Sequence, residues 1–364
     1  MKNKIGILTY HAAHNYGSML QAFALQSFLE QRGFNVRILN LRKSIQKKVY
    51  AQTLDIKHPK SFIYRLLKNP VDSVNCQKKW SNFERFIREN LNVTKECKDV
   101  QEVRTLISKD SYYAFVVGSD QIWNTACLDF DNSFLLPFEG NFKKVAYAPS
   151  MGPKPVFQNE DFEELFAKYL PMFDGISTRE TQSSKFLHEK FSIDTTTVLD
   201  PVLLLKDETY SSLYGEKPLI KGKYIFYYSP LCKKKYYEKA QQLSLLTGLP
   251  IVVTQSHDYY GGAKTFYACG PKEFLNILKY STYTVGRSFH LLAFSLLFHK
   301  DFYSIEGAVD DRMFHLMNHC NLLNRSVLVA DKIGKLQPAI DYENVDVKLE
   351  ELRKRSILYL SENL

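Results

Sequence analysis

One segment of the chain combines a histidine with an arginine where both could act on an anion. Residues 285–290 read VGRSFH and lie between an expected strand and an apolar helix that ends near Phe298. His290 would stand at the amino end of that helix, where the guanidinium of Arg287 and the backbone N–H groups stabilise negative charge. Because histidine titrates near neutral pH, the segment predicts a proton donor beside an anion site. A purely structural histidine is the alternative.

A second arginine, Arg179, follows another short expected strand within residues 176–180, ISTRE. At such a junction a guanidinium can hold a carboxylate or a phosphate through two parallel hydrogen bonds, which lysine does less well. The sequence therefore makes Arg179 a candidate anion-binding residue. The alternative is an exposed arginine that pairs with Glu180 or Asp174.

The first strand-to-helix turn, residues 11–18 (HAAHNYGS), is a candidate binding loop. Gly17 lets the backbone approach a ligand closely, and the N–H groups of the following helix attract an anion. We expect Asn15, Tyr16 and Gly17 to contribute to a binding site, although a plain turn would have the same spacing. The loop matches neither a dinucleotide fingerprint nor a P-loop, which disfavours a dinucleotide or ATP.

Two further polar segments follow expected strands. In residues 118–124, GSDQIWN, Asp120 is placed to hydrogen-bond sugar hydroxyls and Trp123 offers an aromatic face. Ser119 or Asp120 could instead cap the next helix. Asp200 ends another strand just before a proline, so it either binds a hydroxyl, accepts a proton or shapes the turn.

Charge indicates the kind of partner. The chain has 364 residues with 48 Lys and Arg against 39 Asp and Glu, so its net charge of +9 favours anionic partners. The densest basic cluster, residues 42–48 (RKSIQKK), is either a solvated surface or a contact with a membrane face or a lipid diphosphate. We expect no nucleic-acid partner.

Neither metal nor disulfide chemistry is indicated. His11 and His14 have no acidic or sulfur partner at matching spacing, and the six cysteines include no C-x-x-C pair. The apolar run at residues 5–8 is too short for a secretory signal, and no later window reaches the ~18 apolar residues of a membrane span. We therefore expect a cytoplasmic protein without metal or cofactor, in contact with a membrane only peripherally.

The elements that must position these residues alternate between strand and helix. In the first half we expect strands at 4–9, 35–40, 114–118, 145–148 and 196–199, and a helix at 18–32. In the second half we expect strands at 223–228, 250–253, 282–286 and 302–304, and helices at 235–246, 271–280 and 289–298. Such alternation predicts parallel sheets with helices on both faces.

Chain length predicts two α/β domains, because a single core stops growing at roughly 250–300 residues. We expect a doubly wound, Rossmann-like domain at 1–217, with a helical insertion at about 45–110. A second such domain at 218–364 would end in an amphipathic helix near 347–361, and residues 206–222 would form the linker. Ligands of doubly wound folds bind at the carboxyl ends of the strands, so the active site is expected between the domains.

Six of these segments, in order, resemble the polysaccharide pyruvyl transferase family over nearly the whole chain. They are residues 5–33 with the NYG turn, 116–124, 147–152, 176–180, 198–201 and 288–290. The resemblance implies a GT-B-like pair of Rossmann-like domains, phosphoenolpyruvate as donor and no metal. It also implies a donor pocket formed by Arg179, Ser288, Phe289 and His290, with Arg287 as a neighbouring candidate.

The implied reaction moves an enolpyruvyl group to a sugar and forms a pyruvate ketal. His290 would protonate the methylene carbon of the donor, while Arg179 and Arg287 would hold its carboxylate and phosphate. The acceptor would be a precursor of a capsule, an exopolysaccharide or a cell-wall polymer, carried on a lipid diphosphate at the inner membrane face.

The first domain is the expected acceptor side. The residues that we assign to it are Asn15, Tyr16, Gly17, Asp120 and Asp200. On the donor side the chain departs from the family, which usually continues its histidine segment with glycine and a small polar residue. Here Leu291 and Leu292 follow, and their side chains could restrict access to the N–H groups at that helix end.

Two other functions fit the same sequence. One is a glycosyltransferase of the GT-B class that uses a sugar nucleotide, for which Glu306 could bind the ribose. The other is a non-catalytic member of a polysaccharide assembly complex, which would follow if Leu291 closed the donor pocket.

Overall fold

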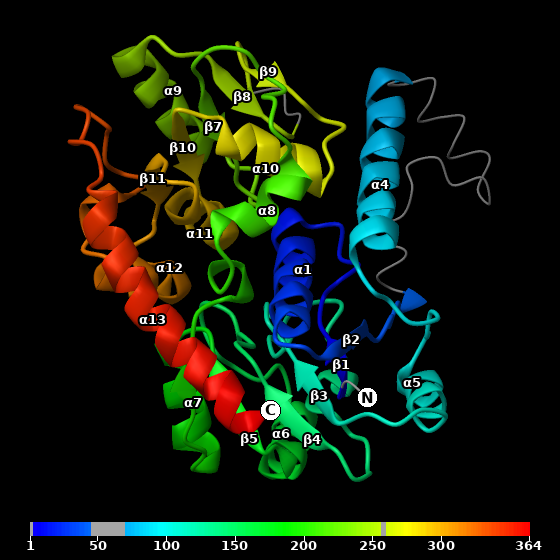
Figure 1. Cartoon of the computed structure of the whole chain (residues 1–364). Helices are drawn as coiled ribbons and strands as arrows, with labels where there is room; N and C mark the ends of the chain where they lie inside the picture. Colours follow the sequence, from blue (N-terminus) through cyan, green and yellow to red (C-terminus); the bar gives the residue numbers. More distant parts are fainter. Residues whose placement is uncertain (1–2, 45–69, 256–259) are drawn as a thin grey trace. The chain divides into compact units, whose positions relative to one another are not determined.

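A computed structural model describes residues 3–44, 70–255 and 260–364 of the chain (Figure 1). The described residues form two compact units. The first unit comprises residues 3–44, 87–205 and 350–364, and the second comprises residues 70–86 and 206–349. The division falls after Leu205, and the last 15 residues of the chain pack with the first unit.

The first unit contains a sheet of six parallel strands in the order β2-β1-β3-β4-β5-β6. The strands are β1 (Lys4–Leu8), β2 (Asn35–Ile38), β3 (Ala114–Val117), β4 (Lys143–Ala146), β5 (Gly175–Thr178) and β6 (Thr196–Thr197). Because β2 and β3 lie on opposite sides of β1, this is the strand order of a doubly wound fold. The central strand β3 is buried throughout, as expected when helices cover both faces of a parallel sheet.

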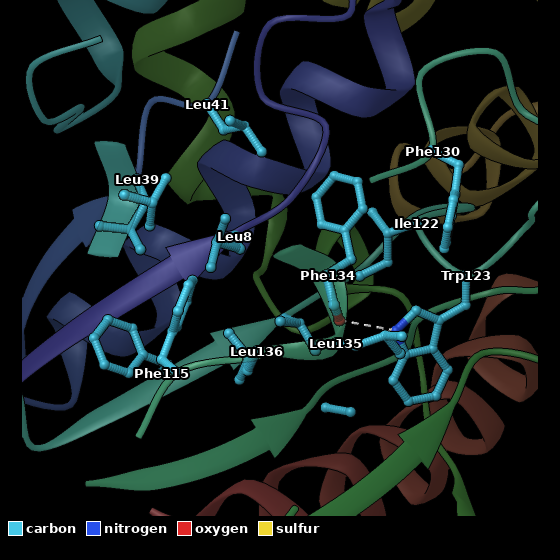
Figure 2. Close-up of a cluster of buried hydrophobic side chains, with 14 of the residues drawn as sticks. Leu8, Leu39, Leu41, Phe115, Ile122, Trp123, Phe130, Phe134, Leu135 and Leu136 are labelled. Atoms are coloured by element: carbon cyan, nitrogen blue, oxygen red, sulfur yellow. Dashed lines mark hydrogen bonds between the residues drawn. The ribbon is translucent and has the colours of Figure 1, made fainter. Parts of the chain in front are cut away.

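Helices and short turns connect these strands. They are α1 (Tyr16–Gln31), α5 (Val100–Ile107), α6 (Glu160–Tyr169), α7 (Thr181–Phe191), the 3-10 turns η1 (Asn132–Leu135) and η3 (Pro201–Leu203), and parts of α4 (Pro70–Asn90) and α13 (Tyr342–Asn363). The core of the unit joins Leu8 and Phe115 from the sheet to Trp123 and Phe134 from the connection after β3 (Figure 2).

The second unit repeats this architecture with a six-stranded parallel sheet in the order β12-β11-β10-β7-β8-β9. Its strands are β7 (Ile225–Tyr227), β8 (Ile251–Val253), β9 (Lys264–Thr265), β10 (Tyr283–Gly286), β11 (Asp301–Ile305) and β12 (Ser326–Val327). Its helices are α8 (Asp207–Tyr214), α9 (Lys234–Thr247), α10 (Pro271–Lys279), α11 (Phe289–Leu297) and α12 (Asp311–His319). The expected fold class, two doubly wound parallel sheets, is confirmed.

The sequence assigned residues 206–222 to a linker between the domains, but α8 occupies the first half of this stretch. This helix has only two turns, too few for a periodic pattern to stand out. It begins with Asp207 and Glu208, whose charges suit a helix amino end, and it buries Tyr210 and Leu213 on one face. Its packing against α10 then makes it part of the second unit.

Some sequence expectations fall partly or wholly outside the described residues. Residues 45–69 of the helical insertion do so, and α4 and α5 occupy most of the rest of that stretch. Most of the basic cluster at 42–48 also lies outside, although its Lys43 forms an ion pair with Asp131 at 2.9 Å. Within the described ranges, we find no helix with the length and apolar character needed to cross a bilayer.

Candidate functional site

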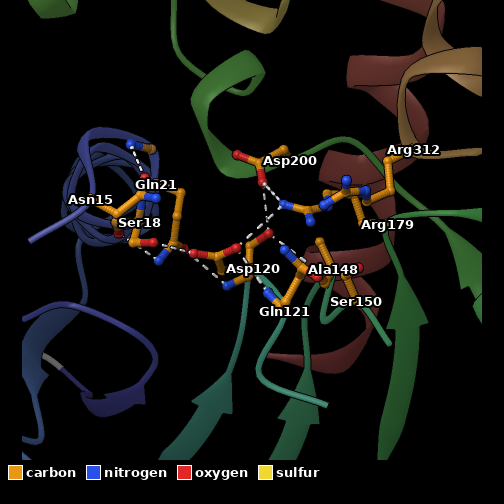
Figure 3. Close-up of polar contacts among 12 residues, drawn as sticks. Asn15, Ser18, Gln21, Asp120, Gln121, Ala148, Ser150, Arg179, Asp200 and Arg312 are labelled. Carbon is orange, nitrogen blue, oxygen red and sulfur yellow. Dashed lines mark hydrogen bonds and ion pairs between the residues drawn. The ribbon is translucent and has the colours of Figure 1, made fainter. Parts of the chain in front are cut away.

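At the carboxyl edge of the first sheet, charged residues from three strand ends form a buried network (Figure 3). The Nη1 atom of Arg179 lies 3.1 Å from Oδ2 of Asp200 and 4.0 Å from Oδ1 of Asp120. Its Nε atom lies 3.7 Å from Oε2 of Glu180. Arg179 is 4% exposed and Asp200 is 1% exposed, so these charges interact almost entirely within the protein.

The network extends through hydroxyl groups. Ser119 donates to Oδ2 of Asp200 at 2.8 Å, and Ser18 of α1 donates to Oδ2 of Asp120 at 2.5 Å. The other oxygen of Asp200, Oδ1, accepts from the backbone N–H of Val202 and caps η3. The turn-shaping alternative for Asp200 therefore matches the geometry, and its acceptor-binding role stays a prediction.

These contacts give Arg179 a partner set unlike the one expected for an anion receptor. Three carboxylates lie within 4.0 Å of its guanidinium, so an anion that binds Arg179 would compete with groups of the protein itself. The donor-binding role of Arg179 stays a prediction. The structure supports a role in joining β5 and its neighbours at the edge of the sheet.

Backbone geometry brings Asp120 to this position. Gly118 has a φ of +115°, and a Cβ atom there would lie 2.0 Å from the carbonyl oxygen of Tyr147, so no other residue fits. Asp120 itself has a φ of 72°, in the left-handed region that aspartate tolerates better than most residues. The chain therefore turns sharply after β3 and directs Asp120 toward the start of α1.

Helix α1 begins at Tyr16, two residues before the expected start at Ser18. Asn15 is its amino-terminal cap, and its Oδ1 atom accepts from the N–H groups of Gly17 and Ser18 at 2.9 and 3.5 Å. The side chain of Tyr16 is buried. The N–H groups expected to attract an anion are thus already engaged, because asparagine is among the best capping residues.

Trp123 does not offer its face to a sugar, and this expectation is wrong. The side chain is fully buried, and its Nε1 donates to the carbonyl oxygen of Phe134 at 3.0 Å (Figure 2). The ring also packs edge-on against Phe166 and Phe173. The chain after β3 turns back into the core, so the indole of Trp123 points into the core.

We expect Trp123→Phe to lower the free energy of unfolding by about 1–3 kcal/mol, because the buried carbonyl of Phe134 loses its donor. Urea unfolding monitored by circular dichroism measures this loss. Trp80→Phe, at a half-buried position of α4, is the matched control and should cost less. Unchanged stability in the Trp123 variant, combined with weaker sugar binding, would contradict the core assignment.

At the carboxyl edge of the second sheet, two arginines meet two carboxylates. Arg287 follows β10 directly, and its Nε atom lies 3.2 Å from Oε2 of Glu306, which follows β11. Arg287 Nη2 lies 4.0 Å from Oδ2 of Asp310. Arg312 donates to both carboxylate oxygens of Asp310, at 2.8 and 2.6 Å. Burial works to raise the pKa of Asp310, but hydrogen bonding and charge from Arg312, with Arg287 adding, hold it below its ordinary value.

The histidine segment forms the first turn of α11. Ser288 caps the helix, and its hydroxyl accepts from the N–H group of Leu291 at 3.3 Å. His290 is half-buried, and the centre of its ring lies 5.3 Å from the ring centre of Phe289, which is itself largely buried. Gly286 is needed just before, because a Cβ atom there would lie 1.8 Å from the carbonyl oxygen of Tyr228.

The expected obstruction by leucines is not seen. The side chains of Leu291 and Leu292 are buried in the interior of the second unit, and the N–H group of Leu291 is occupied by the hydroxyl of Ser288. Since successive helix positions point about 100° apart, these leucines can face the core while His290 faces another side. Whether this departure alters the use of the donor stays a prediction.

The predicted site residues thus fall into two groups, one at the carboxyl edge of each sheet. The first group joins Asp120, Arg179 and Asp200, with Asn15 capping the helix whose Ser18 contacts Asp120. The second group joins Arg287 and His290 on the strand-to-helix connection after β10. Sequence reasoning missed Ser18 in the first turn of α1, and Asp310 and Arg312 at the start of α12, none of which has a motif of its own. It also missed Gln21 of α1, whose Oε1 accepts from the N–H group of Ser119 at 3.1 Å.

In the described part of the chain, histidines and cysteines elsewhere do not assemble into a metal centre. His11 is buried, with its ring nitrogens 3.2 Å from the carbonyl oxygen of Thr9 and 2.9 Å from Oδ1 of Asn40. The six cysteines are free thiols. Over residues 3–44, 70–255 and 260–364, no group of three or more His, Cys, Asp or Glu side chains is arranged to hold a metal ion.

Fold and site together define a protein of two Rossmann-like units of the GT-B class, with polar groups at the carboxyl edge of each sheet. The chain belongs to the polysaccharide pyruvyl transferase family, whose sequence model matches residues 15–307. No curated protein matches the chain.

Solved structures of low identity share the fold. One is a putative UDP-N-acetylglucosamine 2-epimerase from Listeria monocytogenes, with 10% identity and a TM-score of 0.52 over 99% of this chain and 90% of that one. Another is the UDP-GlcNAc 2-epimerase from Methanocaldococcus jannaschii, with 10% identity and a TM-score of 0.50 over 96% and 92% of the two chains. At such identity the likeness shows the fold alone.

Proposed function

We propose that this protein transfers an enolpyruvyl group from phosphoenolpyruvate to a sugar of a capsule, exopolysaccharide or cell-wall polymer precursor. The product is a pyruvate ketal, and no metal or cofactor takes part. Membership of the polysaccharide pyruvyl transferase family supports transfer to a polysaccharide or its precursor. Phosphoenolpyruvate as donor and the particular acceptor are what the resemblance to this family implies, and they belong to our proposal.

The observation that carries the proposal is the hydrogen bonding of the Arg287 guanidinium. Its Nε atom is buried and lies 3.2 Å from Oε2 of Glu306, yet among the described residues it makes no well-aligned hydrogen bond. A buried N–H group whose hydrogen bond is poorly aligned is suited to an anionic ligand that offers better geometry. Phosphoenolpyruvate carries a carboxylate and a phosphate, and arginine binds either group through charge-assisted hydrogen bonds.

His290 would supply the proton that starts the reaction. Protonation of the methylene carbon of phosphoenolpyruvate makes the neighbouring carbon electrophilic, and a sugar hydroxyl then attacks that carbon and loses its proton. Phosphate departs, and attack by a second hydroxyl of the same sugar closes the ketal. The sum is one diol and one phosphoenolpyruvate converted to one ketal and one inorganic phosphate.

The first unit would hold the acceptor. Asp120 lies at the carboxyl edge of its sheet with Ser18, and this edge is where doubly wound units bind ligands. The roles of Asn15, Tyr16, Gly17 and Asp200 in acceptor binding belong to the proposal. A lipid-diphosphate carrier at the inner membrane face would place the reaction in the cytoplasm, with a peripheral membrane contact.

Ligand-dependent thermal unfolding tests the donor. A ligand at 100 times its Kd stabilises the folded state by about 2.7 kcal/mol, so phosphoenolpyruvate should raise the melting temperature by several degrees. The Arg287→Ala variant should lose this shift. Phosphate release from phosphoenolpyruvate, measured against a panel of lipid-linked sugars, then identifies the acceptor.

The other outcomes are equally informative. Stabilisation by a nucleoside diphosphate and not by phosphoenolpyruvate would assign a glycosyltransferase that uses a sugar nucleotide. Stabilisation by neither compound would favour a non-catalytic member of an assembly complex. Either result would overturn the proposed function.

A further inference from the structure

Glu306 pairs with the arginine that we assign to the donor. It lies 27% exposed in its side chain, and Oε2 is 3.2 Å from Nε of Arg287 and 3.4 Å from the hydroxyl of Tyr236. The guanidinium of Arg287 stands over the ring of Tyr236, with 5.9 Å from its central carbon to the ring centre. Glu306 therefore forms the shortest ion pair of Arg287, at a position where both side chains are largely buried.

The neighbouring pair is built differently. Arg312 and Asp310 are joined by two short hydrogen bonds, and the Asp310 side chain is only 2% exposed. Such a bidentate ion pair is strong, and both oxygens of Asp310 accept from Arg312. The contact of Asp310 with Arg287, at 4.0 Å, is too long for a hydrogen bond. Asp310 is thus committed to Arg312, and Glu306 is the main counter-ion of Arg287.

This arrangement has a consequence for an anionic donor. Two arginines and two carboxylates sum to zero charge, so the donor meets a neutral group of side chains while Glu306 stays on Arg287. A donor that takes the Nε N–H group of Arg287 competes with Glu306, whose Oε2 atom faces this same group. The Arg287–Glu306 pair is more exposed than the Arg312–Asp310 pair and lacks an aligned hydrogen bond, so breaking it should cost less free energy.

The backbone at Glu306 also points to a role for the side chain. Its φ of 55° lies in the left-handed region, and its N–H donates to the carbonyl oxygen of Val327 at 2.9 Å. Glycine adopts this conformation without cost, and glutamate does not. The next residue, Gly307, is a glycine, whereas the position with the positive φ is occupied by glutamate. A strained backbone that carries a charged side chain onto Arg287 is consistent with a functional use.

We propose that Glu306 is an internal counter-ion of Arg287, which the carboxylate or phosphate of the donor displaces on binding. Glu306 then sets the affinity for the donor, because every anion that binds Arg287 must first replace a carboxylate. The site thereby discriminates against weakly charged ligands, and the free protein avoids an uncompensated cation. This inference rests on the proposed function, since it takes Arg287 as the donor-binding residue.

Isothermal titration calorimetry of the full chain with phosphoenolpyruvate, and separately with inorganic phosphate, tests the inference. Glu306→Gln keeps the size of the side chain and removes its charge, so we expect Kd for both anions to fall by about 3- to 10-fold. A positioning role would instead raise Kd, because Arg287 would lose its orientation. Glu216→Gln, at an exposed loop position with the same change in charge, is the control and should leave Kd unchanged.

Two variants keep the inference and the proposed function separable. If Arg287→Ala leaves phosphoenolpyruvate binding intact, the proposed donor site fails and the inference fails with it. If Arg287→Ala abolishes binding while Glu306→Gln binds equally or more weakly than the parent, only the inference is overturned. Glu306→Asp, which retains the charge on a shorter side chain, should give an intermediate Kd and serves as the test should the glutamine variant not fold.

Discussion

Replacement of His290 by alanine is expected to lower kcat for phosphate release by about 10²- to 10⁴-fold, the usual contribution of a positioned general acid. The fold should remain intact. His290 is half-buried in the first turn of α11, where alanine is an excellent helix former, so the change opens no large cavity. Initial-rate measurement of phosphate release and thermal unfolding of the same preparation check both parts.

A matched control separates catalysis from general effects. His188 lies on α7, has a side chain that is 64% exposed, and pairs with Asp194. We assign it no role in binding or catalysis, so His188→Ala should retain the parental kcat. His290→Gln, which can donate a hydrogen bond but cannot act as an acid near neutral pH, should lose as much activity as the alanine variant. Parental turnover in either His290 variant would remove this residue from the mechanism.

Replacement of Arg179 by methionine is expected to lower the free energy of unfolding by about 3–5 kcal/mol, because removal of one partner leaves buried carboxylates without their cation. Asp200 and Glu180 are the groups left behind. Urea denaturation measures the loss, and Arg355→Met at an exposed position of α13 is the control. The size of the effect follows from burial, since an exposed ion pair would contribute less than about 1 kcal/mol.

A double variant tests the cause of that loss. Asp200→Asn combined with Arg179→Met should be less destabilised than the sum of the two single variants, because neither charge is then left alone. The Arg179→Lys variant tests whether Arg179 binds the donor instead of serving a structural role. Parental stability with weakened phosphoenolpyruvate binding in that variant would return Arg179 to the donor site, as the sequence predicted from the bidentate geometry of arginine.

The strands and long helices of this protein could be predicted from local patterns. Runs such as AFVV at Ala114–Val117 are apolar throughout because both faces of a parallel sheet are covered, and that burial leaves a visible record in the sequence. Short elements left no such record. Helix α8 has two turns and buries only Tyr210 and Leu213, which is too little for periodicity to reveal.

Side-chain direction at the loops was much harder to predict. The segment GSDQIWN was expected to present both Asp120 and Trp123, yet the chain turns back into the core after Asp120 and buries the indole. Similarly, the pairing of Arg179 with neighbouring Glu180 was among the alternatives, but its closer partner is Asp200, 21 positions away. Such partners depend on which strand ends become neighbours in the sheet.

The amino-acid sequence by itself determined the fold class and the family, because both depend on the order of apolar runs and short motifs along the chain. Only the tertiary structure decided which arginine is committed to the protein and which has a loosely held counter-ion. A guanidinium has the same chemistry in Arg179 and Arg287, and the difference arises from burial and from carboxylates that folding brings beside it.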